Sequence, residues 1–176
     1  ADFRPLEEDP STNLWVWENT FAAGSPTGLN MAGQAEGWVS LVVGSVGWSG
    51  AGFNVGADFG DIDMTDIYNN PDDYVFHVAL KRAQASSSVQ FIFNDGTAEA
   101  KVTVGTIAIE GLAPYVDYTR DNEWQIVEIP VTYLNSLGIF YNETFSDVNV
   151  LAFLCGGVGG VTLDLDAAFF YKPAAE

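Results

Sequence analysis

Basic residues are scarce in this 176-residue sequence. Six Lys and Arg stand against 24 Asp and Glu, which gives a formal net charge of −18 at pH 7. A nucleic-acid-binding protein needs a positively charged surface, and an anionic lipid surface would repel this chain. No apolar run approaches the roughly 20 residues of a membrane helix; the longest candidate, 148–161, is interrupted by four glycines. The composition therefore excludes nucleic-acid binding and a membrane span.

Histidine and cysteine occur once each, as His77 and Cys155. A single His excludes a multi-histidine metal site, and a single Cys excludes an internal disulfide. No Gly-x-Ser-x-Gly motif accompanies His77, and no glycine-rich phosphate-binding motif precedes a helix. These absences argue against the commonest hydrolase and nucleotide-binding chemistries.

Short segments with period-two alternation dominate what is present. Phe76, Val78 and Leu80 alternate with His77 and Lys81, and no stretch of 12 or more residues has a convincing helical period. The sequence therefore predicts an all-β protein, an antiparallel β-sandwich or barrel, with residues 1–13 as a flexible leader and 14–172 as one domain. We expect strands over residues 14–18, 37–43, 53–55, 74–81, 89–94, 100–104, 124–129, 148–155 and 161–171, and one helical turn at 133–137.

Carboxylates cluster at two places. Asp164 and Asp166 alternate in the last predicted strand and therefore share a face, where they repel each other unless a cation or hydrogen-bond donors intervene. Hard oxygen ligands of this kind suit calcium, and Glu18 is a candidate third ligand if the first and last strands are neighbours. The second cluster, Asp58, Asp61, Asp63 and Asp66, is either a solvated acidic loop or a pair of catalytic carboxylates.

Aromatic rings beside uncharged polar groups suit a sugar, which presents apolar C–H faces and hydroxyl edges. Trp48 lies in a predicted glycine-rich loop, and Tyr115 and Tyr118 lie in another predicted loop. The other four Trp, at 15, 17, 38 and 124, are expected to fill the interior. We also expect an outward polar stripe on adjacent strands, composed of His77, Lys81, Gln90 and Asn94.

The order of four segments resembles a known family. These segments are a first strand with Trp and Glu (14–18), Tyr-x-Phe-x-Val-x-Leu-Lys (74–81), Trp-x-x-Val-x-Ile-Pro (124–130) and a closing Leu-Asp-Leu-Asp-Ala-Ala-Phe-Phe-Tyr-Lys (163–172). Together they resemble the galactose-binding-like jelly-roll carbohydrate-binding modules, including domains of Bacteroidetes surface glycan-binding lipoproteins.

The resemblance implies a jelly roll, an extracellular or cell-surface location, and a structural calcium held by Glu18, Asp166 and Asp164. It also implies glycan binding on a concave sheet face, where His77, Lys81 and Gln90 would lie, or at loops such as the one with Trp48. The sequence lacks an obvious row of solvent-facing Trp. This favours, as the ligand, a soluble glycan chain or its end over crystalline polysaccharide.

Three functions remain open. The first is a non-catalytic module that binds a neutral glycan and is tethered to other modules or to a lipid anchor, because the negative charge would repel polyanionic glycans. The second is a glycoside hydrolase or polysaccharide lyase on the same scaffold, with Asp61 acting with Asp63 or Asp66. The third is a structural or adhesion domain with a large apolar patch.

Overall fold

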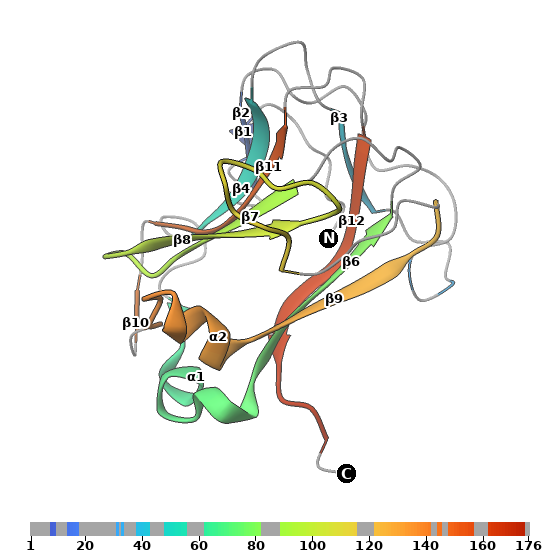
Figure 1. Ribbon diagram of the computed structural model, residues 1–176. Coiled ribbons are helices and arrows are strands. Elements are labelled where there is room, and N and C mark those ends of the chain that lie inside the picture. The colour runs from blue at the N-terminus through green and yellow to red at the C-terminus, as the bar shows by residue number, and fades with distance from the viewer. Residues whose placement is uncertain are drawn as a thin grey trace.

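The chain folds into two antiparallel β-sheets that face each other, with short helices at one end (Figure 1). The computed structural model describes residues 8–9, 14–17, 31, 33, 38–42, 48–55, 62–81, 89–115, 122–141, 144–145, 148–156 and 162–174. The larger sheet contains β1 (Glu8–Asp9), β2 (Leu14–Trp17), β4 (Trp48–Val55), β11 (Val148–Gly156), β7 (Val89–Asn94) and β8 (Glu99–Val104), in that order.

The smaller sheet is ordered β3 (Val39–Val42), β12 (Thr162–Tyr171), β6 (Val75–Lys81) and β9 (Gln125–Pro130). A separate pair joins β5 (Ile62–Asp63) to β10 (Thr144–Phe145). The helices are α1 (Thr65–Asn69), the 3-10 turn η1 (Pro71–Asp73) and α2 (Val131–Ser136). The predicted antiparallel β-sandwich of the jelly-roll class is confirmed, and α2 contains most of the helical turn expected at 133–137.

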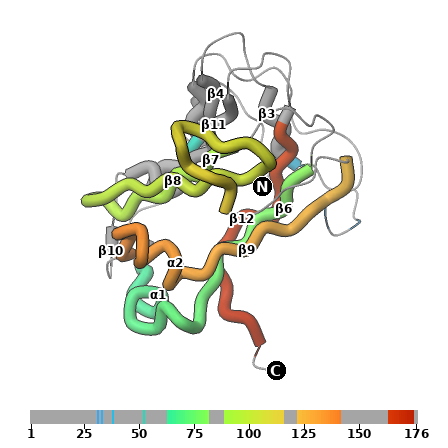
Figure 2. The backbone as a smooth tube through the Cα atoms, viewed as in Figure 1, coloured from blue at the N-terminus to red at the C-terminus, as the bar shows by residue number. Residues whose placement is uncertain are grey.

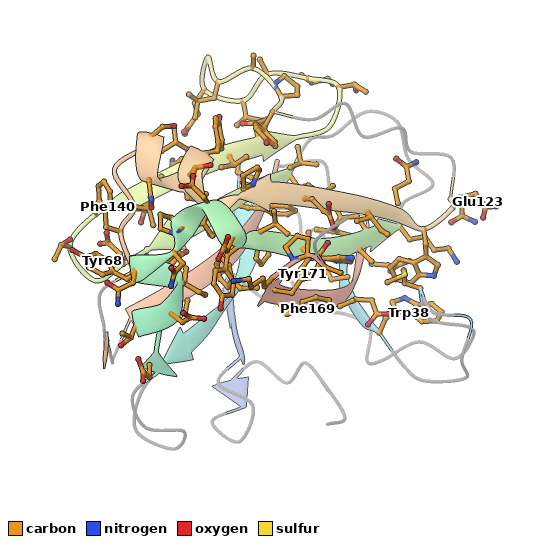
Figure 3. The ribbon with its side chains drawn as sticks, turned by 90° about the horizontal axis from the view of Figure 1, so that it is seen from below. Trp38, Tyr68, Glu123, Phe140, Phe169 and Tyr171 are labelled. Atoms are coloured by element: carbon orange, nitrogen blue, oxygen red, sulfur yellow. The ribbon has the colours of Figure 1, made fainter. Side chains whose placement is uncertain are left out.

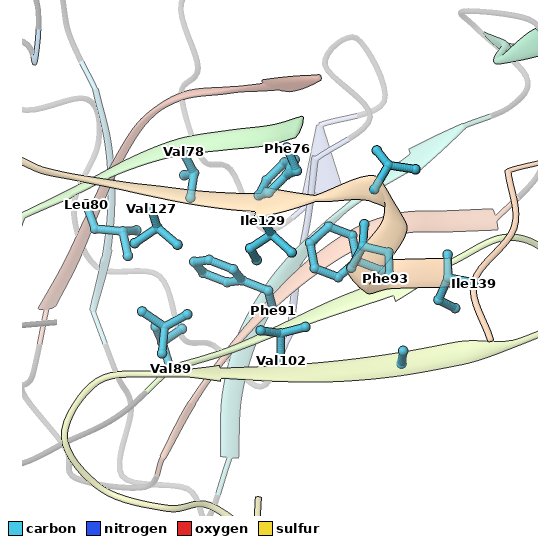
Figure 4. Packing of buried hydrophobic residues seen from close by; sticks show 14 of the residues in the cluster. Phe76, Val78, Leu80, Val89, Phe91, Phe93, Val102, Val127, Ile129 and Ile139 are labelled. Atoms are coloured by element: carbon cyan, nitrogen blue, oxygen red, sulfur yellow. The ribbon is translucent and has the colours of Figure 1, made fainter. Parts of the chain in front are cut away.

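The core lies between the sheets, because one alternating set of residues from each strand points inward. Phe76 of β6 packs edge-on against Phe91 and Phe93 of β7, with ring centroids 6.3 and 5.1 Å apart. Figure 4 shows these rings with their aliphatic neighbours from β6, β9, β7 and β8. Each such fully buried side chain contributes about 1.5–3 kcal/mol relative to exposure, so the alternating pattern holds the two layers together.

Asp95 fastens the β7–β8 hairpin to the segment after α2. One carboxylate oxygen accepts hydrogen bonds from the Thr97 and Ala98 N–H groups at 2.8 and 2.7 Å, and the other accepts the Phe140 N–H at 2.8 Å. Burial by itself would raise the pKa of Asp95, but these donors outweigh it and hold the pKa below the ordinary 3.8. The hairpin turns at Asp95-Gly96, with Asn94 opposite Glu99.

Beyond β8 the chain folds back on itself (Figure 2). The Tyr115 N–H donates to the Thr103 carbonyl at 2.7 Å, and Lys101 forms an ion pair with Glu110 at 2.9 Å. This segment therefore lies against the edge of the larger sheet and approaches α2.

One expectation about strand neighbours is wrong, and one condition set for the calcium hypothesis is not met by strand pairing. β6 and β7 lie in different sheets, so the outward faces of these strands point to opposite sides of the sandwich. β2 and β12 also lie in different sheets, so the first long strand and the last strand are not paired neighbours. Alternation within a strand gives the inward and outward sets, but it does not say which strands pair.

Candidate functional site

The outer face of the smaller sheet gathers aromatic and charged side chains. The side chains of β6 outside the core cluster are those of Val75, His77, Ala79 and Lys81, and residues of neighbouring strands lie opposite them. Figure 3 shows Tyr171, Phe169 and Trp38 on this side of the molecule. We call this surface the aromatic face; its members are Trp38, His77, Ala79, Lys81, Trp124, Ile126, Glu128, Asp164, Asp166, Phe169 and Tyr171.

The first cluster on the aromatic face surrounds His77. The Phe169 ring stacks on the imidazole at 4.8 Å with an interplanar angle of 14°, and the Tyr171 ring meets Phe169 edge-on at 5.8 Å. The Tyr171 hydroxyl donates to Oε1 of Glu128 at 2.6 Å. His77 is 7% exposed and Phe169 is 46% exposed, so the outer side of the Phe169 ring is the available stacking surface of this cluster.

A β-bulge in β12 places this ring. Asp166 pairs with Ala79 and Phe169 pairs with His77, so β12 uses one more residue than β6 over this interval. Ala167 lies in the left-handed region with φ 51°, which is uncommon for a residue other than glycine. The extra residue turns Phe169 outward, so the bulge converts what would be a core position into an exposed one.

Asp166 holds the bulge in place. Its Oδ1 accepts the Ala167 N–H at 2.9 Å, and its Oδ2 accepts the Met31 N–H at 3.1 Å. Each carboxylate oxygen therefore satisfies a backbone donor, one of them 135 residues away in the sequence. The Asp166 carboxylate therefore links the bulge to the backbone at Met31.

The second cluster lies at the far end of β6. The Trp38 and Trp124 rings meet edge-on at 5.6 Å, and Nζ of Lys81 lies 5.4 Å from the Trp38 ring and 5.8 Å from the Trp124 ring. These are cation–π distances, so the two rings hold the ammonium group in position. Trp38 is buried and Trp124 is half-buried.

Two pKa values on the aromatic face are shifted. Burial lowers the pKa of His77 below its ordinary 6.5, and the negative charge of Glu128 opposes this shift. The hydrogen bond to Glu128 raises the pKa of the Tyr171 hydroxyl above its ordinary 10. At neutral pH the imidazole and the phenol of the first cluster are therefore uncharged.

The predicted polar stripe is divided between the two sheets. His77 and Lys81 share the outer face of β6 as expected, although Phe169 covers His77. Gln90 lies on the other sheet, is fully buried and donates to the Thr103 hydroxyl at 3.3 Å. Gln90 is therefore not available to a ligand, and the prediction that it and Asn94 continue the stripe is wrong.

Of the three aromatic residues that were predicted in loops, the structure brings none of those that it describes to the aromatic face. Trp48 is the first residue of β4 and pairs with Gly156, so the expected glycine-rich loop is wrong there, and its side chain lies outside the described part of the structure. Tyr115 packs on Tyr133 of α2 with ring centroids 4.4 Å apart, away from the aromatic face. Tyr118 lies outside the described residues.

The described carboxylates of the acidic cluster at 58–66 accept hydrogen bonds from nearby residues of the chain. Asp63 accepts the Thr65 N–H at 2.9 Å, and Asp66 accepts hydrogen bonds from the Asn70 amide and the Tyr74 hydroxyl. Asp61 and Glu18 lie outside the described residues. Among the residues that are described, no three His, Cys, Asp or Glu side chains form a group suited to a metal ion.

Sequence reasoning missed the most exposed ring of the site. Simple alternation from Asp166 would turn Phe169 inward, and the bulge that reverses this has no clear sequence signature because Ala167 is not a glycine. Trp38 is buried as expected, whereas Trp124 is only half-buried, and both rings lie next to Lys81 on the aromatic face. Their positions next to strand ends, at 38 and 124, are the signal that could have indicated this.

Neither a protein-family model nor a curated protein matches the sequence. An exo-β-agarase structure is similar, with a TM-score of 0.58 and 8% identity over 97% of this chain; the chain spans only 24% of the agarase. Two structures of family 30 carbohydrate-binding modules are also similar, with TM-scores of 0.50 and 0.51 and 15% identity.

The likeness to these structures is one of fold. The first of the two family 30 modules belongs to a cellulosomal cellulase of Clostridium thermocellum, and this chain covers 85% of it. The chain covers 78% of the second module. The similarity extends over 94% and 96% of this chain, so the whole β-sandwich is shared with modules of that class. No described helix is long and apolar enough to cross a membrane.

Proposed function

We propose that this chain is a non-catalytic carbohydrate-binding module that binds a neutral glycan on the aromatic face. The main supporting observation is the Phe169 ring, which is exposed outward, stacked on His77 and flanked by the Tyr171–Glu128 hydrogen bond. The shared fold with family 30 carbohydrate-binding modules is consistent with this proposal.

The chemistry of the face matches that of a sugar. The apolar C–H side of a pyranose stacks on a flat ring. Here the imidazole of His77 packs beneath the Phe169 ring and fixes the orientation of that ring. Glu128 accepts hydrogen bonds from hydroxyls, and the ammonium of Lys81 donates them. Lys81 lies next to two indole rings, and Glu128 accepts a hydrogen bond from the Tyr171 hydroxyl. Because both side chains are already positioned, little side-chain freedom is lost when a ligand binds.

The first prediction concerns Phe169. Replacing Phe169 with Ala removes the exposed stacking surface, and we expect affinity for the bound neutral glycan to fall by about tenfold or more. Affinity electrophoresis and calorimetry against a panel of neutral polysaccharides, including cellulose-derived and agar-derived chains, measure this loss. The fold should be unaffected because the ring is half exposed.

Phe140→Ala is the matched control. Phe140 is 49% exposed, close to the value for Phe169, but it follows α2 and lies away from the aromatic face in Figure 3. Its truncation should leave affinity within about twofold of the wild type. Equal losses in both variants, or no binding to any glycan by the wild type, would contradict the proposal.

The alternative functions have weaker support. Asp63 and Asp66, the described members of the acidic cluster at 58–66, accept local hydrogen bonds. The hydrolase hypothesis therefore depends on Asp61, which lies outside the described residues. Release of reducing sugar from the same polysaccharide panel, lost in Asp61→Asn, would establish it. The structural or adhesion hypothesis stays a prediction; a stable protein complex that survives loss of glycan binding would favour it.

Calcium, cell-surface location and tethering to other modules or a lipid anchor also remain proposals. Calcium takes six to eight oxygen ligands, and the described residues offer Asp164 and an Asp166 whose oxygens already accept backbone hydrogen bonds. They do not by themselves form such a cage, so a calcium site would require Glu18 or other residues beyond them. An unchanged melting temperature after treatment with a chelator would contradict bound calcium.

A further inference from the structure

His77 lies beneath the ring on which the proposed binding site depends. Its side chain is buried, and the Phe169 ring covers one face of the imidazole at a centroid distance of 4.8 Å. Nδ1 of the imidazole is also buried, and it has no hydrogen-bond partner among the residues that the structure describes. A titratable ring therefore lies directly under an exposed aromatic ring, at a place that offers no acceptor for an N–H group on Nδ1.

The groups packed against His77 come from two strands. Glu128 of β9 and Phe169 of β12 are its pairing partners on either side. The Tyr171 ring of β12 meets the imidazole edge-on at 6.0 Å, and the Tyr171 hydroxyl donates to Oε1 of Glu128 at 2.6 Å. The carboxylate next to the imidazole is thus already engaged by the phenol.

The other charged groups of the aromatic face lie further along it. Lys81 is four residues from His77 on β6, about 13 Å away at the rise of a strand, and its ammonium lies next to two indole rings. Asp166 pairs with Ala79, and both of its carboxylate oxygens accept backbone N–H groups. Among the described residues, Glu128 is therefore the charged group that faces the imidazole.

Uptake of a proton changes what this place requires. An imidazolium carries an N–H group on both nitrogens, so Nδ1 becomes a buried donor without an acceptor. Cation–π attraction to the Phe169 ring does not replace the hydration that burial removes from the charge. The proton is accommodated when water reaches Nδ1 past Phe169, or when Glu128 leaves the Tyr171 hydroxyl and pairs with the imidazolium. Either change disturbs the surface on which a sugar would stack.

From this geometry we infer that His77 is a positioning residue, and that the aromatic face binds glycan when its imidazole is uncharged and releases it on acidification. The inference rests on the proposed glycan-binding function and adds the regulation of that site. Burial lowers the pKa of His77, which is consistent with a cover that opposes protonation. Because linkage is reciprocal, a glycan that holds Phe169 in place should lower this pKa further.

The first test follows the imidazole by NMR in the free protein. His77 is the only histidine in the sequence, so its Hε1 signal can be assigned without ambiguity. Phe169→Ala opens the imidazole to water, and we expect it to raise the pKa of His77 toward the ordinary 6.5. Phe140→Ala, which truncates a ring of similar exposure elsewhere, should leave this pKa unchanged. An unchanged or lower pKa in Phe169→Ala would overturn the inference.

The second test measures affinity against pH. Calorimetry with cellohexaose and with agarohexaose compares the wild type with His77→Phe, which keeps a flat ring beneath Phe169 and cannot take up a proton. For the probe that binds, the wild type should lose about threefold or more in affinity relative to the variant between pH 7.5 and about 4.5. Glu128 is present in both proteins, so the difference between the two profiles belongs to His77. Parallel profiles would overturn the inference.

A third measurement needs no substitution at position 77. In the wild type saturated with the binding probe, the His77 signal should titrate at lower pH than in the free protein. The same pKa in both states would show that ligand and proton do not compete, and would also overturn the inference. Glycan binding without any dependence on His77 would refute the coupling and leave the binding module intact. Absence of binding to both probes and to every polysaccharide of the panel would refute the proposed function and, with it, the coupling.

Discussion

At the scale of single residues, Phe169 and Phe170 are adjacent in sequence but serve different purposes. Phe170 packs against Phe76 and Tyr141 with ring centroids 5.3 Å away in each case, and so belongs to the interior. Phe169 lies on the outer surface over His77. One ring therefore packs in the core and the other lies on the aromatic face, because consecutive residues of a strand face opposite sides of the sheet.

His77 should make stability depend on pH. Its pKa in the folded protein lies below 6.5 because it is buried, so the unfolded chain takes up a proton first as the pH falls. Its contribution is fully present above about pH 6.5, decreases as the pH falls below that value, and levels off below the folded pKa. The groups that face it are Glu128 across the strand and the Phe169 and Tyr171 rings.

Urea unfolding of the wild type and of His77→Phe between pH 7.5 and about 5 measures this effect. The variant keeps a flat ring beneath Phe169 and removes the titration. We expect the free energy of unfolding of the wild type to fall relative to the variant as the pH decreases through this range. Parallel pH profiles would show that His77 does not titrate differently in the folded and unfolded chains.

At the scale of elements, the bulge of β12 links the fold to the site. Asp166→Ala removes the acceptors of the Ala167 and Met31 N–H groups, and we expect a loss of about 1–3 kcal/mol in the free energy of unfolding. Weakened glycan binding should accompany it, because Phe169 depends on the bulge for its outward position. Urea unfolding and calorimetry on the same variant measure the two effects.

Asp164→Ala is the comparison variant for this prediction. Asp164 lies on the same face two residues before Asp166, where β12 pairs regularly with β6 ahead of the bulge. Its replacement leaves both carboxylate acceptors at the bulge in place, so the outward position of Phe169 should be less affected than in Asp166→Ala. Similar behaviour of the two variants, with both losing calcium-dependent stability, would instead favour the calcium prediction.

At the scale of the whole molecule, the charge of −18 limits the ligands that the face can accept. Glu128, Asp164 and Asp166 lie on the aromatic face together with the single cation Lys81. We expect no measurable binding to alginate or polygalacturonate at low salt, because like charges repel over the Debye length. Affinity for the neutral ligand should be nearly independent of salt.

Affinity electrophoresis in gels that contain each polysaccharide, at low salt and at about 0.15 M salt, provides the measurement. Retardation by an anionic polysaccharide that disappears as salt is added would contradict this prediction.

The fold that this chain shares with solved structures is also a property of the whole molecule. The chain covers most of two family 30 carbohydrate-binding modules but only a quarter of the exo-β-agarase chain. If the aromatic face binds glycan as proposed, a domain of this size suits a module whose affinity is increased by tethering to neighbours. The tether and the location remain proposals.

Strand positions were predictable because alternation is local. The segments at 75–81, 89–94 and 125–130 differ from the predicted ranges by one residue at most, since period-two hydrophobicity and a following turn or Pro define them. β4 was the exception: its glycines at 50 and 52 weakened the pattern, and the strand begins at Trp48 rather than near Phe53. Pairing with β11 compensates for the low propensity of those glycines.

By itself, the sequence determined the all-β class, the inward set of regular strands such as β6 and β9, and the exclusion of nucleic acid through charge. Those properties depend on local periodicity and on composition. Only the tertiary structure decided that β6 and β7 belong to opposite layers, that Gln90 is buried, and that a bulge turns Phe169 outward. Pairing between distant strands and the register at a bulge depend on contacts such as Asp166 with Met31, 135 residues apart, which no local pattern contains.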